Sequence, residues 1–197
     1  MRSAAALGFR VKSGWATAVL LAGPRAAPRV VERRIAELSD PAVPEARQPY
    51  HAGIGRHEAR VAREVTRLVR AVERYARSSL SRLVAGYRRG GHQIRGVGIV
   101  VGSTIDPARI ANDHIRAHAE EGRLFRSVIE TAARAAKLRA RVVLEKELYA
   151  HAAKALGIAA LRLKARVAAL GETVDGPWRA EEKAAALVAW IVLRSPT

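Results

Sequence analysis

Residues 4–38 constrain the fold more than any other part of the chain, because they predict three consecutive strands. The segments are AALGFRVKS, WATAVLLAG and RVVERRIAEL, which are short apolar or alternating runs bounded by turn residues. Gly14 allows a tight turn after the first segment, and GPRAAP supplies the second turn. We therefore expect the chain to begin with a three-strand meander.

Helical and strand patterns alternate beyond the meander. A Pro- and Gly-rich loop at 39–55 leads into a helix that runs to about Tyr87. The run GVGIVVG, residues 96–102, is typical of a strand buried on both faces. Asp106 and Pro107 then supply the cap and first residue of a second long helix, which lasts to about Lys137.

The last third of the chain predicts one short strand at 141–144 and three helices, at 145–156, 159–170 and 179–194. Together these elements predict an α/β fold. Its five-stranded mixed sheet combines the meander with two parallel strands and carries helices on both faces.

Length and composition favour one soluble domain. A chain of 197 residues that is 49% hydrophobic suits a single domain over 1–197: the meander 1–38, the loop 39–55, an α/β core 56–144 and C-terminal helices 145–197. The lack of cysteine excludes thiolate catalysis and fits a reducing compartment, so we expect a cytoplasmic protein. Its longest uncharged apolar stretch, 184–193, is about half of what a membrane span needs, and no membrane partner is expected.

The net charge of +17 comes almost entirely from arginine, since only six of the 35 basic residues are lysine. Between Arg56 and Arg95, eleven arginines face three glutamates. Seven of the eleven recur at alternating spacings of four and three, which keeps them in one stripe on a helix, with apolar residues opposite. This arginine stripe consists of Arg56, Arg60, Arg63, Arg67, Arg70, Arg74 and Arg77.

An unbroken stripe of like charges costs helix stability by a few tenths of a kcal/mol per pair, so it favours an anionic partner. Nucleic acid, RNA or DNA, is the polyanion that we expect. No aromatic residues interleave the stripe, which indicates contacts to phosphate and not to bases. Two alternatives remain open: a solvated face relieved by glutamates and counter-ions, and an interaction module that docks on an acidic partner protein.

The predicted order of elements resembles the ribonuclease H-like superfamily, particularly its Holliday-junction resolvase and actin-like ATPase branches. Leu7-Gly8-Phe9-Arg10 in the first strand and the Ala-rich helix that begins at Glu181 carry the resemblance. Members of these branches hold two divalent metals on carboxylates of strand one, strand four and the last helix. Here Arg10 takes the place of the strand-one acid and GVGIVVG contains no acid, so the resemblance implies the scaffold without two-metal nuclease chemistry.

A fainter resemblance is to the middle domain of eukaryotic-type peptide-release factors, in which a Gly-Gly-Gln loop precedes a basic helix. Here the loop reads Gln48-Pro49-Tyr50-His51-Ala52-Gly53 and lacks the paired glycines. This resemblance therefore implies no release chemistry, although the basic helix stays compatible with RNA.

The carboxyl edge of the sheet is one candidate site, because open α/β sheets bind ligands beyond the ends of their parallel strands. If strands one, four and five are parallel, that edge gathers one cation among several acids and hydroxyls. Such a cleft is consistent with an ion pair, a phosphate seat or a one-metal site, while Asp106 and Glu145 also suit plain helix-start roles. The residues are Lys12, Ser13, Ser103, Thr104, Asp106, Glu145, Glu147 and either Glu181 or Glu182.

Two histidines and a glutamate form the second candidate site. His114, His118 and Glu121 fall at i, i+4 and i+7 inside the apolar arc of the helix from Pro107, and buried polar groups need partners. The three suit a proton network or a metal. The polar groups expected to complete such a site are Asn112 beside them and Tyr50 and His51 in the long loop. A histidine pair satisfied by backbone groups is the competing interpretation.

The sequence thus predicts a nucleic-acid-binding protein of ribonuclease H-like fold. The alternative from another class is a hydrolase or phosphotransferase that acts on phosphates or phosphodiesters, with a divalent metal as its cofactor. Its candidate catalytic residues are His114, His118, Glu121 and Glu145.

Overall fold

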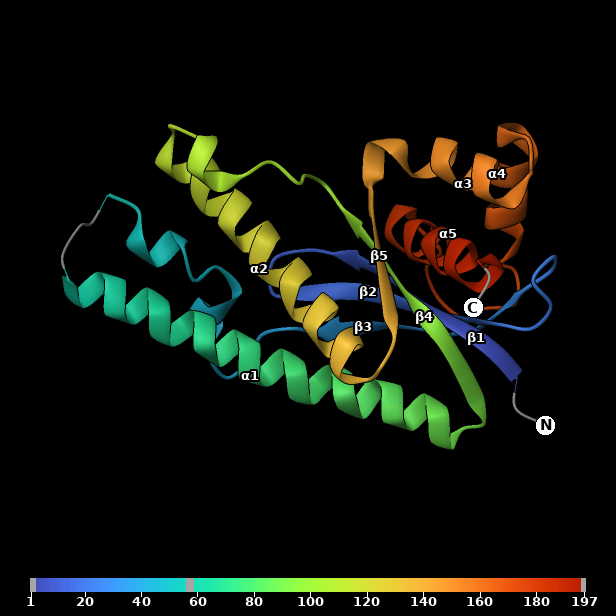
Figure 1. The fold of residues 1–197 in the computed structure, drawn as a ribbon, viewed down its shortest axis with the longest axis horizontal. Coiled ribbons are helices and arrows are strands. Elements are labelled where there is room, and N and C mark those ends of the chain that lie inside the picture. The colour runs from blue at the N-terminus through green and yellow to red at the C-terminus, as the bar shows by residue number, and fades with distance from the viewer. Residues whose placement is uncertain (1–2, 56–58, 196–197) are drawn as a thin grey trace.

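A five-stranded mixed sheet carries the rest of the molecule (Figure 1). The computed structural model describes residues 3–55 and 59–195. The strands are β1 (Ser3–Val11), β2 (Trp15–Ala22), β3 (Arg29–Glu37), β4 (His92–Val101) and β5 (Arg139–Leu144), in the order β3-β2-β1-β4-β5. β1, β2 and β3 form an antiparallel meander, and β4 and β5 run parallel to β1. The predicted α/β architecture is confirmed.

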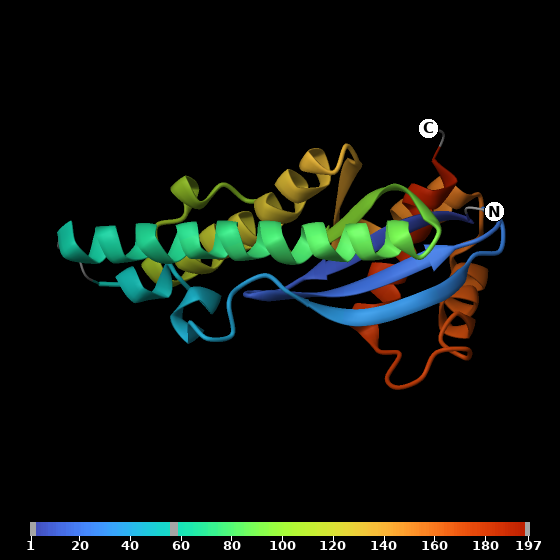
Figure 2. The ribbon, with the colours of Figure 1, turned by 90° about the horizontal axis from the view of Figure 1, so that it is seen from below.

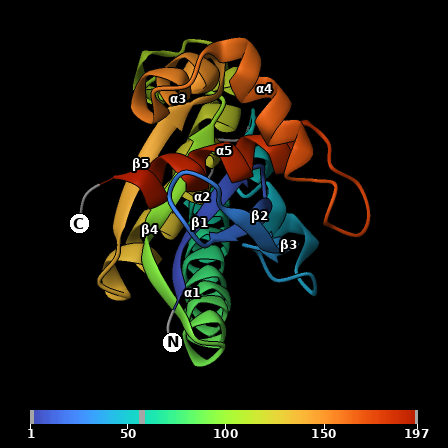
Figure 3. The same cartoon turned by 90° about the vertical axis from the view of Figure 1, so that its right-hand side faces the viewer.

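Two helices cover one face of the sheet and three cover the other. α1 (Ala59–Arg89) and α2 (Asp113–Ala135) pack on the first face, and α3 (Leu148–Leu156), α4 (Ala160–Ala169) and α5 (Ala180–Arg194) lie on the second. Figure 3 shows α5 lying across the strands with α3 and α4 beyond it. Within the described residues, no helix is both long and apolar enough to cross a bilayer.

The period-two alternation of β1 separates these two cores. Leu7 and Phe9 are buried against α1 and α2, whereas Ala6 belongs to the core under α5. Gly8 also faces α5, and a Cβ at this position would lie 1.8 Å from the carbonyl oxygen of Ala185. Glycine is therefore required here, because the backbones of β1 and α5 come too close for any side chain.

The turn between β1 and β2 depends on Gly14, whose φ of 84° is in the left-handed region that glycine adopts freely. Its carbonyl oxygen accepts hydrogen bonds from the backbone N–H groups of Leu38 and Ser39, at 2.9 and 3.0 Å. These bonds attach the residues that directly follow β3 to the β1–β2 turn. That loop is partly ordered into two short 3₁₀ turns, η1 (Pro44–Arg47) and η2 (His51–Gly53).

The helix expected to start at Pro107 is interrupted, which corrects the prediction. Asp106 does cap a turn, since its Oδ1 accepts from the N–H of Ala108 at 3.2 Å, but that turn is only η3 (Pro107–Arg109). α2 begins later, at Asp113, with Asn112 as its N-cap accepting from the N–H of Ile115 at 3.0 Å. Two Asx caps six residues apart each favour a new start over a continuous helix.

α1 reaches well beyond the sheet (Figure 2). It has 31 residues, which corresponds to about 46 Å of helix. Its C-terminal half lies along the strands, while its N-terminal half contacts η1, η2 and the start of α2. We call this overhanging part, made of η1, η2 and the first halves of α1 and α2, the arm.

Candidate nucleic-acid interface and histidine cluster

The arginine stripe lies on the solvent-facing side of α1. Six of its residues are within the described range and all six are exposed: Arg60, Arg63, Arg67, Arg70, Arg74 and Arg77. Val61, Leu68 and Val72, on the opposite side, are buried. The seventh predicted residue, Arg56, lies outside the described residues. The spacing of four and three thus places a cationic ridge opposite the packing face.

Only part of this charge is neutralised within the protein. Arg67 forms a two-point ion pair with Glu64, with nitrogen–oxygen distances of 3.0 and 2.6 Å. Hydrogen bonding from Arg67 holds the pKa of the Glu64 carboxyl below its ordinary value. Among the described residues, Arg70, Arg74 and Arg77 have no ion-pair partner. Their guanidinium groups present free donors to solvent.

Four arginines of the stripe surround one open hollow of about 590 Å³ on α1: Arg63, Arg67, Arg70 and Arg74, together with Ala62 and Thr66. Guanidinium groups bind phosphate oxygens through paired N–H donors. The hollow is therefore suited to an anionic group.

A cluster of three histidines lies where η2 meets α2. His51 comes from η2, and His114 and His118 come from successive turns of α2. The ring centroids are 4.4 to 5.0 Å apart, and Nε2 of His118 lies 3.2 Å from Nε2 of His114. One ligand atom from each ring lies within 4.8 Å of the other two. Of the loop residues predicted to complete this site, His51 is the one that lies against the pair on the helix.

Glu121 supports this cluster from below. Its side chain is fully buried, and Oε1 lies 2.7 Å from Nδ1 of His51, while Oε2 lies 3.9 Å from Nδ1 of His118. Burial raises the pKa of the Glu121 carboxyl, and the hydrogen bond from His51 acts in the opposite direction. His114 and His118 themselves are exposed, as is Ile115, so the predicted apolar arc is wrong along the first turns of α2. There the sheet no longer covers the helix, because these turns belong to the arm.

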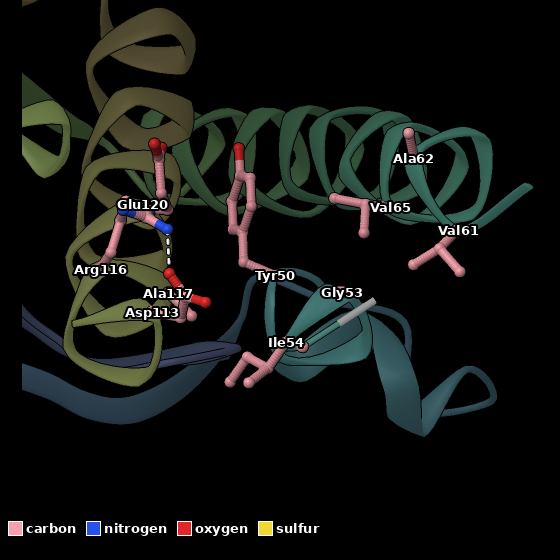
Figure 4. A pocket seen from close by; sticks show the side chains of 11 residues that line it. Tyr50, Gly53, Ile54, Val61, Ala62, Val65, Asp113, Arg116, Ala117 and Glu120 are labelled. Atoms are coloured by element: carbon pink, nitrogen blue, oxygen red, sulfur yellow. Dashed lines mark hydrogen bonds and ion pairs between the residues drawn. The ribbon is translucent and has the colours of Figure 1, made fainter. Parts of the chain in front are cut away.

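A pocket of about 480 Å³ opens beside the histidine cluster, between η2, α1 and α2 (Figure 4). Tyr50 stands over it from the loop, and Val61 and Val65 of α1 form an apolar wall. Asp113 and Arg116 pair with one another on the α2 side. Burial, followed by the nearby Glu120 carboxylate, raises the pKa of the Tyr50 hydroxyl. Tyr50 therefore lines a pocket next to the cluster and not the cluster itself.

At the carboxyl edge of the sheet, Arg10 forms an ion pair with Glu145. It is buried, and its guanidinium contacts both oxygens of Glu145, at 3.0 and 2.5 Å, and donates to the carbonyl of Val11 at 2.6 Å. Beside it, Lys12 lies 3.4 Å from Glu181 at the start of α5. Of the three interpretations of this edge, the structure shows ion pairs.

Most other residues predicted at this edge have local structural contacts. Glu182 accepts from the backbone N–H of Arg179 at 2.9 Å as part of the α5 cap, and Ser103 accepts from the N–H of Ile105 at 3.1 Å. Ser13 is half-buried in the β1–β2 turn, and Asp106 caps η3. Glu145 pairs with Arg10, and among the described residues no contact joins it to the histidines. The candidate catalytic set is thus divided between two places.

Removing either partner of the Arg10–Glu145 pair should destabilise the fold unequally. Glu145→Ala leaves a buried guanidinium with only the Val11 carbonyl, and we expect a loss of about 2–3 kcal/mol in the free energy of unfolding. Arg10→Met should cost less, because Glu145 is half-exposed and can be hydrated. Urea unfolding of both variants and the double variant measures the coupling; equal losses would contradict this assignment.

Similarity to known proteins was found in the structure and not in the sequence. Neither a known protein family nor a curated protein matches the sequence. Two solved structures of Thermus thermophilus RuvC, one in complex with Holliday junction substrate, each superpose with a TM-score of 0.55. They share 8% and 10% sequence identity, cover 95% of this chain, and are themselves covered to 90% and 92%. The fold is ribonuclease H-like.

This similarity supports the ribonuclease H-like topology predicted from the order of elements, and no more of the predicted resemblance than that. The release-factor resemblance receives no support from these comparisons. Two features of the site were not foreseen in detail. Arg10 was recognised as the residue replacing an acid, but its pairing with Glu145 depends on the parallel register of β1, β4 and β5. The sequence names His51 with Tyr50 and Asn112 as residues to complete the site, and the position of η2 against α2 selects His51 among them.

Proposed function

We propose that this protein binds nucleic acid through phosphate contacts made by the arginine stripe of α1. The observation that carries the proposal is the exposure of six arginines on one side of a single helix, five of them without an ion-pair partner in the described part of the chain. From Arg60 to Arg77 the stripe is about 25 Å long. Double-stranded DNA presents one negative charge per about 1.7 Å of its axis, so one helix of this length can meet several phosphates.

The fold comparison supports the same proposal in general terms. One of the two RuvC structures is in complex with Holliday junction substrate, so a protein with a similar fold binds a nucleic acid. At 8% identity we carry over only the class of partner, nucleic acid, and not the junction. The site proposed for that partner rests on the arginine stripe of this protein and not on any residue of RuvC.

Salt dependence tests the proposal directly. If six phosphates are contacted, the affinity for a duplex should fall by about 10³-fold between 50 and 200 mM salt. Fluorescence anisotropy with duplex DNA, single-stranded DNA and RNA of equal length measures this and ranks the three ligands. Failure to bind any of them at 50 mM salt would refute the proposal. Co-purification of an acidic protein without nuclease-sensitive material would instead favour the interaction-module alternative.

We also propose that the sheet edge does not cleave nucleic acid by two-metal chemistry. The strand-one position holds Arg10, already paired with Glu145, and a guanidinium repels the cations that such chemistry needs. With Mg²⁺ or Mn²⁺, we expect no cleavage of linear or branched DNA above the background of a mock preparation. Cleavage that disappears in Glu145→Gln would contradict this prediction.

A further inference from the structure

The histidine cluster has the spacing of a metal site. Two nitrogen ligands on a tetrahedral Zn²⁺, each at 2.0–2.1 Å, are about 3.3 Å apart. The Nε2 atoms of His114 and His118 are 3.2 Å apart. His51 brings a third ring to the same place, within 4.8 Å at its ligand atom.

Glu121 sets the direction of the rings. It faces Nδ1 of His51 and Nδ1 of His118, which leaves Nε2 of each ring for a ligand. A carboxylate behind a ligating histidine fixes the tautomer and increases the basicity of the ring. Nε2 of His51, the atom that faces away from Glu121, is buried without a hydrogen-bond partner among the described residues. A buried polar atom of this kind is rarely left unsatisfied, so it points to a missing partner.

We propose that His51, His114 and His118 bind one Zn²⁺ ion through their Nε2 atoms, with Glu121 as the positioning residue behind them. Three imidazoles favour a borderline metal such as Zn²⁺ over Mg²⁺ or Ca²⁺, which take oxygen ligands. The exposed side of His114 and His118 leaves the fourth position to solvent. The ion would link η2 to the first turns of α2 and so connect two parts of the arm.

The experiment uses the full chain after treatment with a chelator. Titration with Zn²⁺ against a chromophoric chelator should give one equivalent, and Co²⁺ should give the visible absorption of a four-coordinate site. We expect His114→Ala and His118→Ala each to lower the Zn²⁺ affinity on the order of 100-fold or more. His151→Ala is the matched control, since it removes an exposed histidine on α3, and it should bind as the unchanged protein does.

Glu121→Gln distinguishes positioning from ligation. It should lower the Zn²⁺ affinity by about 10–100-fold while the Co²⁺ spectrum keeps its four-coordinate form. Far-UV circular dichroism checks that this buried variant folds, and the two exposed histidine variants keep the test decisive if it does not. Absence of stoichiometric Zn²⁺ binding, or a Zn²⁺ affinity in His114→Ala and His118→Ala that equals that of the unchanged protein, would overturn the proposal. The salt-dependent binding on α1 is measured separately, so either proposal can fail alone.

Discussion

Replacing Arg63, Arg67, Arg70 and Arg74 together with glutamine should lower the affinity for nucleic acid at 50 mM salt by at least about 10²-fold. These four arginines line the hollow on α1, and each phosphate contact contributes about 0.9 to the slope of log affinity against log salt on duplex DNA. The slope should therefore become shallower by about 3.6. Arg60 and Arg77 remain and retain weaker binding. Anisotropy titrations over a range of salt measure both quantities.

A matched variant distinguishes the effect of losing the arginine stripe from the effect of lowering the net charge. Lys154, Arg162, Lys164 and Arg166 are exposed on α3 and α4, across the sheet from α1. Their combined replacement with glutamine removes the same four charges and should change the slope by less than about one unit. Equal losses in the two quadruple variants would show that binding follows net charge and not the arginine stripe.

Gly8→Ala should be among the most destabilising single changes in this protein. The new Cβ would meet the carbonyl oxygen of Ala185 at 1.8 Å, and a backbone atom cannot turn aside as a side chain can. α5 would have to move away from β1, and its packing on β2 and β4 would loosen with it. We expect a loss of about 3 kcal/mol or more in the free energy of unfolding, which lowers the Tm by about 6–12 °C.

Gly122→Ala provides the control of opposite sign. Gly122 is exposed in the interior of α2, and a Cβ there would meet no atom within 4 Å. Alanine should stabilise the helix by about 0.5–1 kcal/mol. Thermal and urea unfolding of the two variants measure both effects. Similar stability for the two would mean that α5 does not approach β1 as closely as described.

The fold was largely predictable because its signals are local. Short alternating runs and Gly14 predict the meander. The absence of charged residues in GVGIVVG predicts the buried strand. The boundaries were less certain where caps compete: Asp106 and Asn112 both start helical turns, and the sequence alone favoured the first. The start of β4 at His92 was missed because Gln93 and Arg95 interrupt its apolar pattern.

The candidate sites were only partly predictable, because they join distant segments. The spacing of His114, His118 and Glu121 was visible on one helix, but His51 reaches them only through the path of the loop. Helical periodicity also assumed that a neighbouring layer covers the whole of α2. Its first turns lie beyond the sheet, so apolar periodicity did not predict burial there.

The overhang of the arm has a consequence for how the molecule opens. Because the first half of α1 rests on short turns and on α2 and not on strands, its local opening free energy is separate from that of the sheet. We therefore expect the arm to open locally while the five strands stay intact. Most of the proposed cationic binding surface, from Arg60 to Arg74, lies on this part of the molecule.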